Sequence, residues 1–213
     1  MALGRKSIVT PELLKHLIDE VNKGKPDLPA DVLNVQGYSS PKIRRLLNAL
    51  CSQPDAVYLE IGVCYGSTFI PAVYGNKARA TCIDHWQMFK GSRELFNANV
   101  KRLIPDREFT ALDGDCFSDD IKAQVLQGVT VYFYDGAHDK EAHYQALMQY
   151  APMLAERFVL VIDDWNWSEP NHGAKQAFGE WGFTRLAEYN LPGAYNGDQA
   201  EWWNGLYVGL FHK

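Results

Sequence analysis

The sequence lacks the features that define several common classes of protein. It contains no repeat and no low-complexity segment, and no apolar run approaches the roughly 20 residues of a membrane span. Its opening stretch, MALGRKSIVTPELL, has no apolar core of the kind found in signal peptides. The four cysteines form no CxxC pair and show no zinc-finger spacing. These absences predict a cytoplasmic protein with reduced thiols that does not enter a membrane.

The chain also lacks an excess of positive charge. It has 21 Lys and Arg residues against 26 Asp and Glu residues, which gives a formal net charge of -5. Because nucleic-acid binding depends on a basic surface, we expect a small molecule rather than a nucleic acid as the main partner. The hydrophobic fraction of 46% is typical of a globular protein, and the length suits a single domain over residues 1–213.

Short apolar runs alternate with helical patterns through the middle of the chain. The helical pattern begins earlier, at residues 11–23 and 41–51. Predicted strands lie at 56–61, 79–84, 108–112, 129–135 and 158–163, and predicted helices between and after them lie at 67–74, 91–103, 118–127, 139–155 and 173–181. Strand–helix alternation of this kind predicts a parallel sheet covered by helices on both faces.

The end of the chain departs from this alternation. Two strand patterns, 183–189 and 205–213, have no helix between them, which indicates an antiparallel hairpin with a long connection. We therefore predict an α/β, Rossmann-like three-layer sandwich whose seven-stranded, mostly parallel sheet ends in this hairpin. The predicted parts are a helical cap (1–53), a cofactor-binding core (54–182) and a hairpin with a substrate-side loop (183–213).

A glycine turn follows the first predicted strand, in the stretch YLEIGVCYGST. Gly62 and Gly66 are separated by three residues, so the turn is neither a P-loop nor a GxGxxG nicotinamide motif. Glu60 ends the strand, and its charge disfavours a pyrophosphate but suits a ligand with an amine or a sulfonium. Asp84 follows 24 residues later at the next strand end, where a carboxylate can accept hydrogen bonds from ribose hydroxyls. A ligand with a ribose and a cationic amino-acid tail is S-adenosylmethionine.

The ordered motifs YLEIGVCYGST, CIDHW, DGDCF, VYFYDGAHDKEAHYQAL and FVLVIDDWNW resemble those of class I S-adenosylmethionine-dependent methyltransferases. More narrowly, residues 38–182 resemble the small metal-assisted O-methyltransferases of the catechol and macrolide-sugar types. The resemblance implies that the glycine turn faces the methionine end of the cofactor, that Asp84 binds the ribose and that Asp115 and Cys116 border the adenine. The full set of predicted cofactor residues is Glu60, Gly62, Gly66, Asp84, Asp115, Cys116 and Asp135. Cys64 stands where the commonest form of this turn has a glycine.

Three carboxylates end two neighbouring predicted strands: Asp135, Asp163 and Asp164. They would repel one another unless a cation lay between them, and oxygen ligands select Mg²⁺ or Ca²⁺. The resemblance implies Mg²⁺ at these positions. Without a metal, Asp135 would contact the cofactor or substrate directly and Asp164 would cap a turn. The candidate catalytic residues are His138 and Asp135, with His138 as general base because its ordinary pKa lies near neutrality. His143 is expected to be structural, and His172 to be a loop or capping residue.

Aromatic residues concentrate in the loops of the predicted substrate side: Trp165, Trp167, Trp202, Trp203 and Tyr195. Flat aromatic faces suit sugar rings or aromatic acceptors, although about half of these residues are expected in the core. The predicted function is O-methylation of a hydroxylated small molecule. The alternatives are a metal-independent O- or N-methyltransferase with His138 as base, and a non-catalytic module that binds the cofactor. A homodimer is compatible with the sequence.

Overall fold

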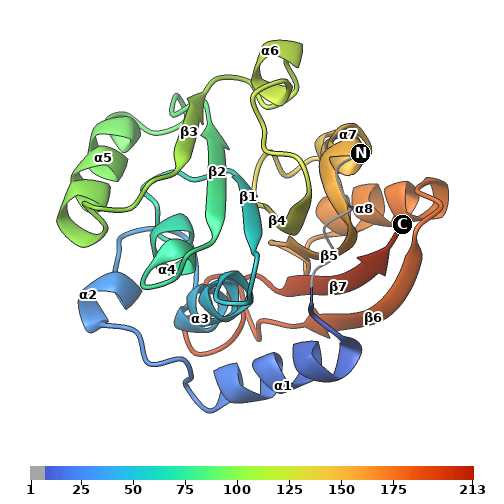
Figure 1. The fold of residues 1–213 in the computed structure, drawn as a ribbon, viewed down its shortest axis with the longest axis horizontal. Coiled ribbons are helices and arrows are strands. Elements are labelled where there is room, and N and C mark those ends of the chain that lie inside the picture. The colour runs from blue at the N-terminus through green and yellow to red at the C-terminus, as the bar shows by residue number, and fades with distance from the viewer. Residues whose placement is uncertain (1–7) are drawn as a thin grey trace.

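The computed structural model describes residues 8–213. These residues contain one seven-stranded sheet. The strand order is β3-β2-β1-β4-β5-β7-β6, and Figure 1 shows this sheet through the middle of the molecule. The strands are β1 (Val57–Ile61), β2 (Arg79–Asp84), β3 (Thr110–Asp113), β4 (Val129–Tyr134), β5 (Leu154–Ile162), β6 (Thr184–Leu191) and β7 (Leu206–His212). The first five run parallel and β7 is antiparallel to both of its neighbours, which confirms the predicted sheet and hairpin.

Helices cover both faces of the sheet and complete the three layers. On one face lie α1 (Pro11–Asn22), α3 (Pro41–Cys51), α4 (Phe69–Val73) and α5 (Ser92–Leu103), and on the other α6 (Asp119–Lys122), α7 (Lys140–Tyr150) and α8 (Ser168–Glu180). A short helix, α2 (Ala30–Leu33), and a 3₁₀ turn, η1 (Ala151–Met153), lie in the connections. None of the helices within residues 8–213 is long and apolar enough to cross a membrane.

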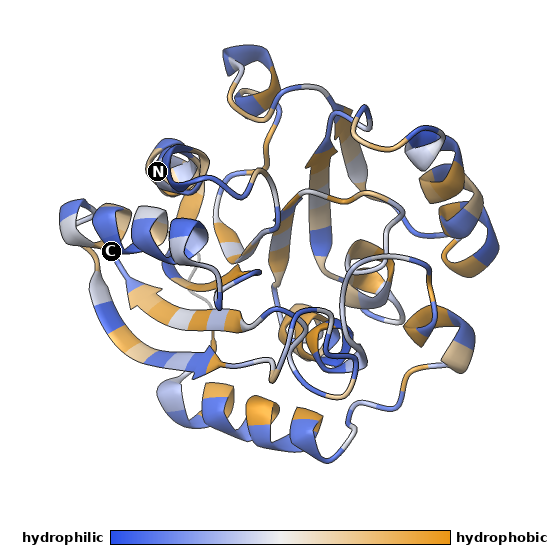
Figure 2. Cartoon of the chain, turned by 180° about the vertical axis from the view of Figure 1, so that it is seen from behind, coloured by the Kyte–Doolittle hydropathy of each residue, from blue (hydrophilic) through white to orange (hydrophobic). Residues whose placement is uncertain are grey.

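The central strands are buried because helices pack on both of their faces. Every residue of β1 and β4 is buried, as expected for the middle of a doubly covered parallel sheet. Helix α1 buries a stripe formed by Leu14, Ile18 and Val21. Figure 2 shows its hydrophobic residues turned toward the rest of the molecule and its hydrophilic residues outward. This amphipathic pattern is what made the helix visible in the sequence.

Several predicted boundaries differ from the structure. The helix predicted at 139–155 ends at Tyr150, and β5 already begins at Leu154, before the polar pair Glu156 and Arg157 that obscured the strand pattern. Helix α8 begins at Ser168 rather than at 173, and the helix predicted at 118–127 ends at Lys122. The loop expected between the first two helices contains α2. Turn-forming residues and helix ends are the places where periodicity carries least information.

Candidate active site

A cavity of about 620 Å³ opens at the carboxyl ends of the parallel strands. It lies at the point where the strand order reverses, with β2 on one side of β1 and β4 on the other. Ligands of open α/β sheets bind at such a switch point, and the volume is typical of small-molecule sites. The predicted site residues that line it are Gly62, Asp84, Asp115, Cys116, Asp135, His138, Asp163 and Asp164.

Gly62 brings the ends of β1 and β4 together. It has a φ of +91°, and a Cβ at this position would lie 1.8 Å from the carbonyl oxygen of Asp135. The Asp135 amide donates to the carbonyl of Ile61 at 2.8 Å, so the two strand ends remain hydrogen-bonded up to the cavity. A glycine is therefore required here by both backbone conformation and close approach.

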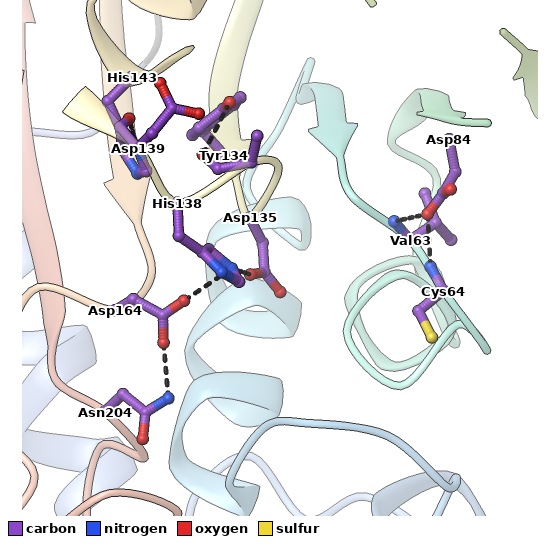
Figure 3. Close-up of polar contacts among 11 residues, drawn as sticks. Val63, Cys64, Asp84, Tyr134, Asp135, His138, Asp139, His143, Asp164 and Asn204 are labelled. Atoms are coloured by element: carbon purple, nitrogen blue, oxygen red, sulfur yellow. Dashed lines mark hydrogen bonds and ion pairs between the residues drawn. The ribbon is translucent and has the colours of Figure 1, made fainter. Parts of the chain in front are cut away.

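Asp84 holds the glycine turn in place. Its Oδ2 accepts hydrogen bonds from the amides of Val63 and Cys64, each at 2.8 Å (Figure 3). Its Oδ1 accepts one from the amide of Trp86 at 2.6 Å. Cys64 has a φ of +50°, and its carbonyl accepts a hydrogen bond from the Trp86 indole at 2.9 Å. Because a carboxylate offers about four lone-pair sites, this arrangement leaves one site of Asp84 for a ligand hydroxyl.

Two predicted cofactor residues do not line the cavity. Glu60 shares the face of β1 that carries Tyr58, and it is fully buried. It accepts hydrogen bonds from the Tyr58 hydroxyl at 2.5 Å and the Thr68 hydroxyl at 2.6 Å, beneath the turn. A Cβ on Gly66 would meet Ile70 at 2.9 Å, so this glycine packs toward the core. In this structure both residues support the turn from behind, because strand alternation and the α4 packing direct them inward.

Burial raises the pKa of Glu60 from its ordinary 4.5 to about 8, although the hydrogen bonds from Thr68 and Tyr58 oppose the shift. A group whose pKa is raised by folding contributes stability that is fully present below its unfolded pKa and is lost as the pH rises through its folded pKa. We expect the wild-type protein to lose up to about 1.4 kcal/mol per pH unit from this group between pH 4.5 and 8. Glu60→Gln should lose less, as measured by urea denaturation from pH 5 to 9. Parallel curves for the two proteins would show that Glu60 does not titrate in this range.

The cysteines divide between the core and the cavity. Cys51 and Cys82 are buried thiols, as predicted, whereas Cys64 and Cys116 are half-buried and line the cavity. Burial raises the pKa of Cys64 and Cys116 to about 12, so their thiols remain protonated near neutral pH. Both therefore act as apolar walls in the resting site.

A cluster of ionisable groups occupies the part of the cavity formed by the ends of β4 and β5. His138 Nε2 lies 2.9 Å from Asp164 Oδ2 and 3.9 Å from Asp135 Oδ1. The amide of Asn204 donates to the other oxygen of Asp164 at 2.6 Å, and Figure 3 shows this cluster apart from Asp84 and the turn. Asn204 also accepts a hydrogen bond from the amide of Gly197, so the β6–β7 loop positions Asp164.

The ionisable groups of this cluster shift one another's pKa values. The neighbouring carboxylates of Asp135 and Asp164 raise the pKa of His138 to about 10. Burial raises the pKa of Asp135 to about 7, partly opposed by the nearby His138. While the two carboxylates are charged, His138 is thus an imidazolium at neutral pH and cannot accept a proton.

Asp163 completes the acidic set but differs from its neighbours. It is 2% exposed, and its Oδ1 has no hydrogen-bond partner among the described residues. Burial raises its pKa well above the ordinary range. Within residues 8–213, the donor atoms that lie within 4.8 Å of one another belong to Asp135, His138 and Asp164. The predicted metal set of Asp135, Asp163 and Asp164 therefore shares two of its members with the group that the structure brings together.

The tryptophans divide as expected between core and cavity. Trp167 and Trp203 line the cavity, and the Trp167 ring packs edge-on against His138 at 5.2 Å. Trp165 and Trp202 are buried in the core, and Tyr195 is 65% exposed. Sequence reasoning missed Asn204, because it lies in a loop with no periodicity and next to no recognised motif.

The two other histidines singled out by the sequence do not line the cavity. His143 is buried edge-on against Tyr134, and burial lowers its pKa to about 4, which fits the structural role expected for it. His172 is exposed on α8 rather than in a loop.

The part of the chain that forms much of this cavity matches a known protein family. A family model described as "Methyltransferase domain" matches residues 59–165, which is half of the chain. The match runs from β1 to the loop after β5 and so contains the glycine turn and the acidic cluster. No curated sequence matches the chain.

Solved structures share the fold at low sequence identity. An O-methyltransferase from Bacillus cereus, solved in complex with SAH, is 14% identical with a TM-score of 0.63, and the alignment covers 97% of this chain and 93% of that one. A protein from Corynebacterium glutamicum is 14% identical with a TM-score of 0.60, covering 92% and 95%. An rRNA methylase from Streptococcus thermophilus is 10% identical with a TM-score of 0.52, covering 78% and 92%.

Proposed function

Because this chain belongs to the methyltransferase-domain family that matches residues 59–165, a family of class I S-adenosylmethionine-dependent enzymes, we propose that it methylates a hydroxyl oxygen of a small molecule. The observation that carries the proposal is the cavity itself. It joins a glycine turn braced by Asp84 to a separate cluster of ionisable groups around His138. A cofactor at the first part and an acceptor at the second would bring the methyl group and its nucleophile together.

The first part of the cavity suits a sulfonium cofactor better than a dinucleotide. Asp84 keeps one lone-pair site for a ribose hydroxyl, and Asp115 and Cys116 line the wall beyond it. Gly62 allows the turn to lie directly against the end of β4. We assign the ribose to Asp84, the adenine to the wall of Asp115 and Cys116, and the methionine end to the turn and Asp135. Two relatives in fold were solved with SAH, which supports this cofactor.

The second part of the cavity suits the removal of a hydroxyl proton. Methyl transfer needs the nucleophile held in line and ready to lose its proton, which positioning and a general base supply. His138 lies beside Asp135 and Asp164, and we propose it as that base. The two carboxylates hold a proton on His138, so their charge must be compensated, and His138 must lose that proton, before it can act as a base.

The acidic set fits a divalent cation. Asp135 and Asp164 converge on one point, and the buried Asp163 has an oxygen with no partner among the described residues. We propose that these three carboxylates hold Mg²⁺, because oxygen donors match its preference and because this leaves His138 free as base. Such an ion, when bound, would compensate the carboxylate charge and orient the acceptor hydroxyl. Alternatively, His138 would take the place of Asp163 as the third ligand. The ion would then be bound by a nitrogen as well as by oxygens, and His138 could not act as the general base.

Thermal unfolding with ligands tests both parts of the proposal. S-adenosylhomocysteine at about 100 times its Kd should raise the melting temperature by about 5–10 °C, and NAD should not. Mg²⁺ added to the EDTA-treated complex should raise it further, and Asp164→Asn should lose that increment while it keeps the response to S-adenosylhomocysteine. Stabilisation by NAD alone would overturn the cofactor assignment, and an unchanged melting temperature with Mg²⁺ would overturn the metal.

A further inference from the structure

We infer that this site methylates acceptors that carry no negative charge: uncharged or amine-bearing ring compounds, and neither nucleic acids nor phosphorylated or carboxylated metabolites. The inference rests on the proposed function, because it concerns the acceptor of that same site. It extends the proposal, because hydroxylation alone does not say which charge the acceptor carries.

The first observation that supports the inference is the charge of the residues that line the cavity. Five carboxylates line the cavity, and none of its described lining residues is a lysine or an arginine: the acids are Asp84, Asp115, Asp135, Asp163 and Asp164. Sites that accept phosphate or carboxylate groups supply arginine, lysine or a helix N-terminus to receive them. Here an anionic acceptor would meet carboxyl groups and no described lysine or arginine, and like charges placed together in a site oppose binding strongly.

Three cationic or ionisable side chains at or beside the cavity wall already have contacts of their own: Arg93, His138 and His85. The guanidinium of Arg93 stacks at 3.8 Å on the indole of Trp86, and it is Trp86, not Arg93, that lines the cavity. His138 is paired with Asp164. His85 also lines the wall, but it follows Asp84 directly and its Nδ1 accepts a hydrogen bond from the amide of Gln87. Among the described residues, no lysine or arginine lines the cavity to receive an anion.

A buried and unpaired carboxylate gives the second, independent observation. Asp163 lines the cavity with one oxygen that has no partner among residues 8–213. A bound Mg²⁺ would satisfy that oxygen, and the cofactor carries one further net positive charge. Neither adds a lysine or an arginine to the wall, so no such side chain among the described lining residues would receive an anionic acceptor.

The remaining wall is apolar and aromatic. Trp167 and Trp203 lie on the side of the acidic cluster, and Tyr38, Phe89 and Met88 line the cavity as well, with Met88 73% exposed. Flat aromatic faces pack against rings, and they also attract ammonium groups. The described wall offers no lysine or arginine to a nucleic-acid backbone, whose binding depends on such cations, although an rRNA methylase shares the fold.

Methyl transfer to charge-matched acceptors tests the inference. Labelled S-adenosylmethionine is incubated with the protein, Mg²⁺ and a mixture of catechol, 3,4-dihydroxybenzylamine, 3,4-dihydroxybenzoate, methyl glucosides, their phosphate esters and ribosomal RNA. Labelled products are first separated from the cationic unreacted cofactor by reversed-phase chromatography and then sorted on an anion-exchange resin, and each acceptor is also assayed alone. Label in these products should pass through the resin, and kcat/KM for each anionic member should be at least about tenfold below that of its uncharged partner. Label retained on the resin, or on RNA, would overturn the inference.

A charge introduced at the cavity wall provides a second test. Met88→Lys should narrow the ratio between uncharged and anionic acceptors several-fold, and the matched control Met88→Gln should leave it unchanged. Equal ratios in both variants would show that charge does not set the preference. The proposed function fails separately: a protein whose melting temperature does not respond to S-adenosylhomocysteine lacks the cofactor site, whatever the charge of its acceptor.

Discussion

Gly62→Ala is expected to abolish cofactor binding and to destabilise the fold by about 3 kcal/mol or more. The new Cβ would lie 1.8 Å from the carbonyl oxygen of Asp135 and 3.0 Å from the amide nitrogen of Gly136, and neither backbone atom can turn aside. Relief requires the ends of β1 and β4 to separate, which breaks the ladder bond from Asp135 to Ile61 and moves the wall of the cavity. Urea denaturation and titration with S-adenosylhomocysteine measure the two effects.

Gly75→Ala provides the matched control for this substitution. Gly75 also has a positive φ, of +69°, but its Cβ would meet nothing within 4 Å. The control should therefore lower the free energy of unfolding by about 1–2 kcal/mol, which is the cost of an alanine in the left-handed conformation. Its affinity for S-adenosylhomocysteine should be unchanged. The difference between the two variants isolates the close approach of β1 and β4. If Gly62→Ala were no less stable than Gly75→Ala, the strand ends could not be as close as described.

The sheet and its acidic rim were predictable because they follow from periodicity. Short apolar runs alternate with helical patterns, and parallel strands bring their carboxyl ends to one edge, so the sequence alone predicts that Asp84, Asp135 and Asp163 share that edge. The start of β5 is harder to predict from the sequence, since Glu156 and Arg157 interrupt the apolar pattern within the strand. Hydrophobic pattern thus predicts which strands exist better than where each begins.

The direction of individual side chains at the site was harder to predict. Glu60 is predicted to bind the cofactor because it precedes the glycines, but it lies on the face of β1 that carries Tyr58, and its carboxylate accepts hydrogen bonds from Tyr58 and Thr68. Both faces of β1 are buried, so alternation alone does not reveal this. Asn204 offered no such signal. Its contact with Asp164 depends on how the β6–β7 loop folds around Asp198, whose side chain accepts three backbone hydrogen bonds. Loop geometry of this kind is not encoded in a local pattern.

His138→Ala is expected to lower the rate of methyl transfer by about 10²–10⁴-fold, the usual contribution of a general base. The responses of the melting temperature to S-adenosylhomocysteine and to Mg²⁺ should survive. His138 lies in the acidic cluster, apart from Asp84 and the turn, so the cofactor keeps its contacts (Figure 3). Initial rates with labelled cofactor and melting temperatures with each ligand measure these quantities on one preparation.

Two further variants make the result decisive about the role of His138. His172→Ala, at an exposed position on α8, should leave rate and binding unchanged. Asp163→Asn should lose the response to Mg²⁺, since it removes charge from the carboxylate whose oxygen has no partner among the described residues. A His138→Ala protein that loses the Mg²⁺ response along with its rate would mark His138 as a ligand, and the proton acceptor would then have to be a carboxylate of the same cluster. Removing a metal ligand would weaken the binding of Mg²⁺. If the rate is lost while the Mg²⁺ response stays intact, the role of general base accounts for both observations.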